Sequence, residues 1–416
     1  MYNKLGKKLW KKAKKIIPGG NSFLSKNPNR FLGENKWPNY YSKAKGCYVW
    51  DLQNKKYIDM SMMSIGTNLL GYSNKYVDDA VRRSINKSIT STLNCPEEVV
   101  LAEKILNLHP WADMVKFART GGETLSMAVR IARAASAKDK IVICGYHGWH
   151  DWYLSANLDN KNNLDTHLFP NLKFSGVPKV LKKTVYTFKY NDFDNLKRIV
   201  EKDKEIGIII MEVERDIPPK FGFLDKVKKL AKKNSIILIF DECSSGFSET
   251  FGGIHLKHKV IPDIAMFGKA LGNGYAITSI IGKREIMKYA ENTFISSTFF
   301  SERIGPTAGI ATLDCMKRTK SWKVISDRGL LIKKELKNIA SNYKIDLEIA
   351  GLKPKINFDF KYKNANFLNK KFTEQMLKRG FLASKQIYIS IAHTPEIINK
   401  YLDNLDKVFK NISKSL

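Results

Sequence analysis

The chain has 416 residues, with 71 lysines and arginines against 40 aspartates and glutamates, and a formal net charge of +31. Its length allows a large core in more than one domain, and an apolar content of 43% is ordinary for a soluble globular protein. No apolar run reaches the roughly 18–20 residues that cross a bilayer, and the basic N-terminus lacks the apolar centre of a signal peptide. We therefore expect a cytoplasmic protein with no membrane partner.

The positive charge raises the question of a nucleic-acid partner. The lysines are spread along the chain, however, and neither a nucleic-acid-binding motif nor an arginine patch interleaved with aromatic residues is present. We expect no nucleic-acid partner, and we expect the charge to attract anionic small molecules. The five cysteines have no CxxC spacing, which argues against a disulfide framework and against a zinc site.

The N-terminal part predicts a helix followed by a hairpin. Residues 3–17 place apolar side chains at a helical spacing opposite a lysine-rich face. A helix on a membrane surface and a helix packed on its own protein or on a partner subunit both fit, and we favour the packed helix. Residues 41–63 alternate apolar and polar side chains around Gln53–Lys55, a pattern typical of a hairpin, and helices are predicted over 75–89 and 96–108.

A glycine turn between a strand and a helix follows. The apolar run 115–118 predicts a short strand, Gly121 and Gly122 come next, and a helical pattern continues to about residue 135. Strand, glycine turn and helix together aim backbone N–H groups and the helix dipole at a phosphate. Most such turns bind nothing, so this motif is weak evidence by itself.

The strand predicted over 141–144 ends in a cluster of polar and aromatic residues, namely Tyr146, His147, His150 and Asp151. The histidines and the aspartate are residue types that bind metals, but their spacing fits no common zinc pattern. We therefore expect no metal here.

Two further segments complete this part of the chain. Residues 157–190 carry no strong motif and are interpreted as an insertion, with an active-site lid and a dimer contact as open alternatives. The apolar run 208–211 predicts a buried strand that ends at Glu212.

The most informative stretch runs from Ile236 to Gly274. The apolar run 236–240 ends at Asp241, and the run 264–267 leads to Lys269 within a glycine-rich turn. Ligands of open α/β sheets bind beyond the carboxyl ends of the strands, so both side chains lie where chemistry is expected. A lysine can hold pyridoxal phosphate (PLP) as a Schiff base while a carboxylate keeps its ring nitrogen protonated. A surface lysine and a helix-capping aspartate are the alternative, and these two residues alone do not decide.

The segments DECSSGF and FGKALGNG of this stretch resemble the class III PLP-dependent aminotransferases, which include glutamate-1-semialdehyde aminomutase. The resemblance runs from about residue 17 to residue 313 and more faintly to His393. It implies an α/β protein with the PLP-dependent transferase fold of type I, in which a mainly parallel seven-stranded sheet forms the large domain and a smaller α+β domain is C-terminal.

Three segments follow from the resemblance and from a change of pattern near residue 316, where amphipathic helices and short strands begin. We expect an N-terminal helix-and-hairpin segment over 1–60, a large PLP-binding domain over 61–315, and a small C-terminal domain over 316–416.

The resemblance also implies roles for individual residues. Lys269 would carry the cofactor, Asp241 would face the ring nitrogen, and Tyr146 would stack on the ring. The other cofactor-binding positions that the match implies are Thr120, Gly121, Gly122, His147, Glu212 and Cys243, of which Cys243 is interpreted as a packing residue. In a homodimer, Thr298 would reach the cofactor phosphate of the neighbouring subunit.

The chain departs from the family pattern at three places. Gly122 stands where the family has a threonine, Val213 replaces the proline after Glu212, and Ser301–Ile304 replaces a Gly-Asn-Pro-Leu sequence. These positions lie beside the expected site, so we expect a different substrate, and Arg303 is a candidate clamp for a substrate carboxylate. The alternative for Arg303 is an interface salt bridge to Glu302 or to a neighbour.

The function predicted from these observations is that of a homodimeric, PLP-dependent aminotransferase that moves an amino group between an amino acid and a carbonyl substrate. The second prediction is an intramolecular amino shift of the glutamate-1-semialdehyde 2,1-aminomutase type. A non-enzymatic basic binding protein is the third, and it leaves Asp241, Lys269 and Tyr146 unexplained. The amino donor and acceptor are not predicted, although a related branch that acts on another carbonyl compound, such as a sugar-linked one, fits the departures.

Overall fold

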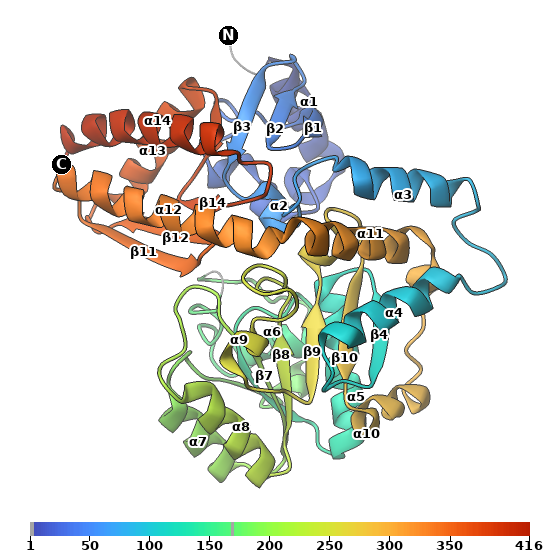
Figure 1. Ribbon diagram of the computed structural model, residues 1–416. Coiled ribbons are helices and arrows are strands. Elements are labelled where there is room, and N and C mark those ends of the chain that lie inside the picture. Colours follow the sequence, from blue (N-terminus) through green and yellow to red (C-terminus); the bar gives the residue numbers. More distant parts are fainter. Residues whose placement is uncertain (1–3, 168–169) are drawn as a thin grey trace. The chain divides into compact units, whose positions relative to one another are not determined.

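The structure is a computed structural model that describes residues 4–167 and 170–416 (Figure 1). The chain folds into two units, one formed by residues 76–322 and the other by the residues up to 75 together with residues 323–416. The N-terminal segment that was expected over 1–60 is part of the second unit, because β3 (Lys56–Met60) pairs in parallel with β13 (Phe381–Ala383). The expected boundary at residue 315 falls inside a continuous helix, α11 (Ile304–Thr319), which packs along α4 (Pro96–Leu108).

A sheet of seven strands forms the centre of the unit of residues 76–322. Within the described residues its order is β4-β10-β9-β8-β7-β5-β6. Its strands are β4 (Met114–Ala118), β5 (Lys140–Cys144), β6 (Val185–Thr187), β7 (Ile206–Glu212), β8 (Ile237–Asp241), β9 (Ile264–Phe267) and β10 (Thr278–Gly282). Only β10 runs against its neighbours, β4 and β9, so the predicted mainly parallel sheet is confirmed.

The central strands of this sheet are short, rich in isoleucine and buried on both faces. Every residue of β7, β8, β9 and β10 is buried, which explains why these segments appear in the sequence as continuous apolar runs rather than as alternating ones. The helix α5 (Gly121–Ser136) packs across β7 to β10 and contributes Leu125, Ala128 and Ile131 to the core. The parallel strands all end at one edge of the sheet, where the loops that carry the polar residues begin.

Six further α-helices of the described residues belong to this unit. They are α3 (Lys75–Ile85), α6 (Asp151–Leu154), α7 (Phe193–Lys202), α8 (Phe223–Lys233), α9 (His255–His258) and α10 (Arg284–Met287). The segment 157–190, which was interpreted as an insertion, ends in β6, and this strand extends the sheet by pairing in parallel with β5. Residues 168–169 of that segment lie outside the described residues.

The second unit contains two small sheets. The predicted hairpin is confirmed as β1 (Tyr41–Lys45), β2 (Tyr48–Asp51) and β3, which form a four-stranded sheet with β13. The other sheet consists of β11 (Leu347–Leu352), β12 (Lys355–Phe360) and β14 (Gln386–Tyr388). The helices are α1 (Lys4–Ile16), α2 (Met63–Gly66), α12 (Ser321–Asn342), α13 (Ala365–Lys378) and α14 (Pro395–Ser413). Phe358, Phe372 and Phe409 stack edge to face between β12, α13 and α14.

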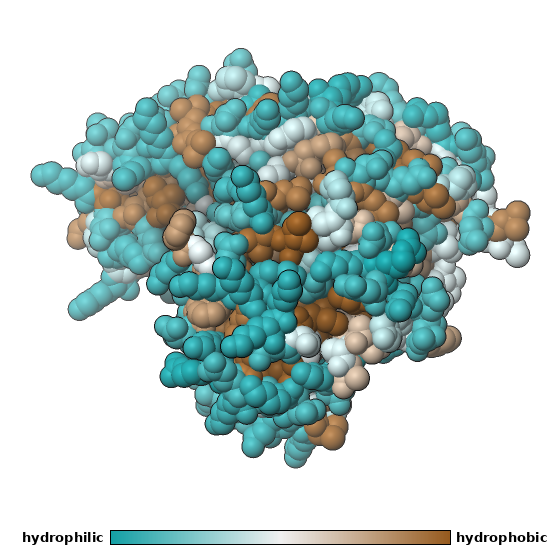
Figure 2. Space-filling view, turned by 60° about the horizontal axis from the view of Figure 1, so that its bottom comes forward, coloured by the Kyte–Doolittle hydropathy of each residue, from teal (hydrophilic) through white to brown (hydrophobic). Residues whose placement is uncertain are grey.

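Hydrophilic residues cover most of the face shown in Figure 2, with smaller hydrophobic areas between them.

The predicted N-terminal helix is present as α1, but only part of its apolar face packs on its own chain. Trp10 and Ala13 are buried, whereas Leu5, Leu9 and Ile16 remain at least 40% exposed. Among the helices of residues 4–167 and 170–416, none has both the length and the apolar character that a membrane crossing requires.

One buried histidine of the second unit makes its stability sensitive to acid. His393 is fully buried, its Nδ1 accepts a hydrogen bond from the Ser390 N–H (3.0 Å), and its Nε2 donates to the Asp59 carbonyl (2.8 Å). These two partners are satisfied by a neutral ring. Burial accordingly lowers the pKa of His393 from its ordinary value of 6.5 to about 4.

We expect the free energy of unfolding to decrease as the pH falls from 7 to 5. Below pH 6.5 the unfolded chain is protonated at His393, whereas the folded chain is protonated there only below about pH 4. At pH 5 this difference lowers the free energy of unfolding by on the order of 2 kcal/mol. Guanidinium unfolding of the wild type and of His393→Gln at both pH values checks this, since glutamine can keep both hydrogen bonds but cannot be protonated. The prediction is wrong if the two proteins lose the same stability on acidification.

Candidate active site

Residues that follow three neighbouring strands meet at the carboxyl edge of the seven-stranded sheet. Asp241, the last residue of β8, is buried, and its Oδ2 lies 2.8 Å from Nδ1 of His147, in the loop after β5. Its other oxygen accepts a hydrogen bond from the Cys243 N–H (2.9 Å). The Tyr146 N–H donates to Oε2 of Glu212, the last residue of β7, over 3.3 Å. The polar residues that were predicted after β5, β7 and β8 are therefore neighbours in space.

Lys269 lies at the same edge, two residues after β9. Its Nζ donates to Oγ of Ser244 over 2.5 Å, and its side chain is half-buried. Its φ of 43° is in the left-handed region, which a lysine seldom adopts and which marks a constrained turn. The sequence reasoning did not identify Ser244, although its place in the segment after Asp241 was a usable signal.

The start of α5 is built to receive an anion. Thr120 and Glu123 form a capping box, in which the Glu123 carboxylate accepts the N–H groups of Arg119 (3.0 Å) and Thr120 (3.3 Å). Gly121 and Gly122 are the first two residues of the helix, so their N–H groups have no intrahelical acceptor and lie at its positive end. Two adjacent N–H groups at a helix N-terminus fit the phosphate of the predicted cofactor.

Glycines allow three of these segments to approach closely. A Cβ on Gly121 would lie 3.4 Å from Sγ of Cys243, and a Cβ on Gly268 would lie 3.2 Å from the same sulfur. The start of α5, the loop after β8 and the turn before Lys269 therefore pack around Cys243. This agrees with its interpretation as a packing residue, and a flat ring that rested here would contact Cys243 rather than a bulky side chain.

Tyr146 is the aromatic residue that this edge offers to such a ring. Its side chain is 37% exposed, and Tyr153 holds it from one side in a T-shaped contact at 5.8 Å between ring centroids. Burial raises the pKa of the Tyr146 hydroxyl, and the nearby Cys243 and Asp241 add to this effect, so the phenol stays neutral at ordinary pH. A half-exposed neutral ring, a buried carboxylate and a lysine amine together fit PLP.

A cavity of about 280 Å³ opens beside Glu212 and was not predicted from the sequence. Its lining includes Gly145, His167, Tyr190, Glu212 and Arg215. Arg215 donates to the Glu212 carboxylate (2.7 Å) and to the His167 carbonyl (2.6 Å). Burial raises the pKa of Glu212 and the Arg215 charge opposes this effect, while burial lowers the pKa of His167 to about 4. A neutral imidazole and a paired guanidinium therefore border the cavity, but no sequence motif indicated either of them.

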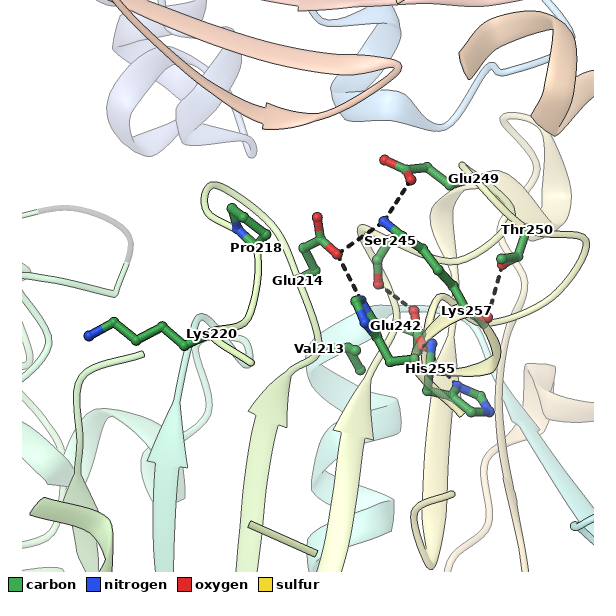
Figure 3. A network of polar contacts seen from close by, with 12 residues as sticks. Val213, Glu214, Pro218, Lys220, Glu242, Ser245, Glu249, Thr250, His255 and Lys257 are labelled. Carbon is green, nitrogen blue, oxygen red and sulfur yellow. Dashed lines mark hydrogen bonds and ion pairs between the residues drawn. The ribbon is translucent and has the colours of Figure 1, made fainter. Parts of the chain in front are cut away.

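A buried network fixes the loop that follows Asp241. Glu242 is fully buried and accepts hydrogen bonds from the backbone N–H and the ring Nδ1 of His255 (both 2.8 Å), and a further one from the Ser245 hydroxyl (Figure 3). The Nε2 of His255 accepts the indole N–H of Trp111 (3.1 Å), so the imidazole is satisfied as a neutral ring. Because the carboxylate is fully engaged, the loop that carries Ser244 is held in one conformation.

A second group of charges ties this loop to the one after β7. Glu214 accepts hydrogen bonds from His258 (2.9 Å) and Lys257 (3.5 Å), and the same lysine pairs with Glu249 over 3.0 Å (Figure 3). The loops after β7 and β8 are therefore joined through α9, next to the residues that follow the strand ends.

The side chain of Arg303, the candidate substrate clamp, is paired within its own chain. Its Nε donates to the carboxylate of Glu97 (3.0 Å) and its NH1 to the carbonyl of Lys87 (3.0 Å). Glu302, named as an alternative partner, pairs with Arg119 instead (3.1 Å). These contacts join the start of α11 to α4 and to the segment before it.

The rest of the departure at 301–304 also has a structural explanation. The Glu302 carboxylate accepts the first N–H groups of α11, from Ile304 (2.7 Å) and Gly305 (2.8 Å), and so caps this helix. Thr298 lies three residues before Ser301 in an exposed turn.

Comparison with known proteins gives a consistent result. The family profile described as aminotransferase class-III matches residues 32–416. The chain is 31% identical to the 3-aminobutyryl-CoA aminotransferase of Cloacimonas acidaminovorans, over 96% of this chain and 97% of that protein. It is also 31% identical to the glutamate-1-semialdehyde 2,1-aminomutase of Methanocaldococcus jannaschii, over 98% of both chains.

Solved structures are similar over almost the whole chain. An omega-transaminase from Sphaerobacter thermophilus superposes with a TM-score of 0.87 at 17% identity, over 98% of both chains. A structure described as a transaminase with PLP bound gives a TM-score of 0.87 at 19% identity, over 100% of this chain and 99% of that chain. The predicted type I fold is confirmed.

Proposed function

The chain belongs to the class-III aminotransferases and is a PLP-dependent enzyme, and on this premise we propose that it transfers an amino group between two separate substrates, with Lys269 as the proton-transferring base. The alternative of a non-enzymatic binding protein is thereby set aside. What remains to be assigned is the role of each residue, the reaction type within the family, and the assembly.

The observation that carries the proposal is the meeting of three groups at one edge of the sheet. The Lys269 amine contacts Ser244, and the Asp241 carboxylate contacts His147. These two residues and the first N–H groups of α5 come from segments that are distant in sequence. These are a lysine amine, a buried carboxylate and an anion site, which match the aldehyde, the ring nitrogen and the phosphate of PLP.

When bound, PLP supplies an aldehyde that accepts the amino group and a protonated ring that withdraws electrons from the amine-bearing carbon of the substrate. Asp241 would hold the proton on the ring nitrogen, and His147 would keep the carboxylate in place. The Lys269 amine would take the proton from the substrate carbon and return it to the cofactor. Tyr146 would cover one face of the ring, and Gly121 and Gly122 would bind the phosphate through their N–H groups.

Two observations favour transfer between separate substrates over the intramolecular shift. One relative that is 31% identical is named 3-aminobutyryl-CoA aminotransferase. The chain also departs from the aminomutase pattern at Gly122 and Val213, close to the proposed site. An intramolecular enzyme needs no external amino donor, whereas a transaminase stops after half a turnover when only a donor is present.

The visible absorption spectrum of the purified enzyme tests this difference. We expect the band of the lysine-linked cofactor to disappear when an amino donor such as glutamate, alanine or 3-aminobutyrate is added alone, and to return when a keto acid follows. If no donor in the panel changes the band, while glutamate-1-semialdehyde is converted without a donor, the intramolecular reaction replaces this proposal. If no band appears even after PLP is added, the assignment of Lys269 is wrong.

We further propose that the enzyme is a cytoplasmic homodimer in which Thr298 contacts the cofactor phosphate of the neighbouring subunit. The exposure of Thr298, and of Phe294 and Phe299 around it (90% and 65%), supports a subunit contact at this turn. All five cysteines are thiols outside any disulfide, which suits a reducing compartment. Sedimentation of the wild type and of Phe299→Asp checks the assembly, and a monomeric wild type would contradict it.

A further inference from the structure

The position that lacks the family threonine is filled by another side chain. A Cβ on Gly122 would lie 2.9 Å from Nδ1 and 3.0 Å from Cε1 of His150. These distances are shorter than real Cβ contacts, so the imidazole of His150 occupies the space that a side chain at position 122 would need. The loop after β5 can approach this closely because Gly148 also lacks a Cβ, which would otherwise lie 2.6 Å from the Gly122 Cα.

The imidazole has an unsatisfied polar atom at this place. Nδ1 of His150 is buried and, in the part of the chain that the structure describes, has no hydrogen-bond partner. The residue itself is well fixed. Trp149 stacks on the ring at 4.5 Å between centroids, and the His150 carbonyl accepts the N–H groups of Tyr153 (2.9 Å) and Leu154 (3.1 Å) at the start of α6. A buried nitrogen in a fixed ring costs free energy unless a ligand satisfies it.

This atom lies beside the anion site of the proposed function. Gly122 is the second residue of α5, and its N–H is one of the two that the capping box leaves available. In the family pattern a threonine hydroxyl at this position would supply one more donor. Here the side chain of position 122 is absent, and a nitrogen from another loop lies at the place of that side chain.

We propose that His150 binds the phosphate of PLP, with its Nδ1–H as the donor that replaces the missing hydroxyl of position 122. The inference rests on the placement of the phosphate at the start of α5. It also explains the departure at Gly122, because a threonine and the His150 ring exclude each other. The imidazole donates as a neutral group, so this contact requires no change of protonation.

Binding of PLP and of pyridoxal, which lacks the phosphate, to the cofactor-free enzyme tests the inference. For His150→Leu we expect the Kd of PLP to rise roughly ten- to hundredfold, as for the loss of one hydrogen bond to a charged group, while the Kd of pyridoxal stays within about twofold. His150→Asn should retain most of the PLP affinity, since its amide nitrogen lies where Nδ1 does. The inference is overturned if PLP and pyridoxal weaken equally, or if neither changes.

A double variant tests whether the His150 imidazole replaces a threonine hydroxyl at position 122. Gly122→Thr alone should weaken PLP binding because it collides with the imidazole, whereas Gly122→Thr combined with His150→Ala should bind PLP better than His150→Ala alone. Pyridoxal affinities and melting temperatures of the four proteins separate phosphate binding from relief of the collision. A double variant that is no better than His150→Ala in the ratio of the PLP and pyridoxal affinities contradicts the proposal.

Gly121→Pro distinguishes a failure of this inference from a failure of the site, because it removes one of the two backbone donors at the first position of α5, where a helix tolerates proline. If Gly121→Pro lowers the affinity for PLP relative to pyridoxal but His150→Leu does not, the phosphate lies at α5 and His150 does not bind it. If neither variant changes that ratio, the phosphate lies elsewhere, and the proposed site is wrong together with the inference.

Discussion

Lys269→Ala is expected to lower the turnover number by about four orders of magnitude or more while the protein stays folded. The amine of this lysine is the proposed group that moves the proton, and its observed partner is a single hydroxyl, that of Ser244. Lys189 also borders the cavity beside Glu212, so peptide mapping is needed to show which lysine carries the cofactor. The side chain is half-buried and lies outside the core, so its loss should change the melting temperature by only a few degrees.

Steady-state turnover and borohydride reduction followed by peptide mapping check this prediction together. Reduction of the wild type should attach the cofactor to Lys269, and the variant should show no attachment. Lys283→Ala is the matched control, because Lys283 is also partly buried in this unit but pairs with Asp263 instead (2.9 Å). A variant that keeps more than about a hundredth of the wild-type turnover would exclude Lys269 as the base.

The second large effect is expected at the buried carboxylate. Asp241→Asn should lower turnover roughly 10²- to 10⁴-fold, because a neutral amide cannot hold the proton on the ring nitrogen. The substitution preserves the shape of the side chain and its acceptor for the Cys243 N–H. His147 can carry its proton on Nε2 and accept a hydrogen bond from the new amide at Nδ1. This tautomer is allowed because Nε2 is buried and has no hydrogen-bond partner within the described residues. We therefore expect a folded enzyme that binds the cofactor.

N-methylated PLP separates this electrostatic role from a general disturbance of the site. Its ring nitrogen carries a fixed positive charge and needs no carboxylate to remain charged. Part of the lost turnover should return when Asp241→Asn is loaded with this analogue, whereas the wild type should gain nothing. The role assigned to Asp241 fails if the variant turns over normally with PLP, or if the analogue restores no activity to a variant that binds it.

The strand ends and the turns around the site could be predicted because their signals are local. An isoleucine-rich run that stops at a charged residue indicates a strand buried on both faces, and this rule located β7, β8 and β9 together with Glu212, Asp241 and Lys269. The short β6 was missed, because three residues at the edge of a sheet carry too little pattern. No local pattern predicts that β10 runs antiparallel to β4 and β9, because this orientation depends on the path of the connecting chain.

Local sequence patterns do not predict which side chains pair when the two residues are distant in sequence. Arg303 was a candidate substrate clamp with a salt bridge to Glu302 or a neighbour as the alternative, and its partner Glu97 lies 206 positions away on α4. When a side chain has two possible partners, its sequence neighbours are the same whichever partner it binds. Only the three-dimensional structure then shows which contact forms. The contact between Gly122 and His150 is of the same kind, since the sequence showed that a hydroxyl was missing but not which side chain had taken its place.

The sequence by itself determined the family, the fold and the positions of Lys269 and Asp241, because these depend on hydrophobic runs, on glycines at turns and on a motif of adjacent residues. Only the tertiary structure decided which side chains those residues meet: Ser244 for the lysine, His147 for the aspartate, and His150 at the start of α5. The physical reason is that strand order brings together loops that the chain keeps far apart, and the energy of a polar contact depends on that distance in space.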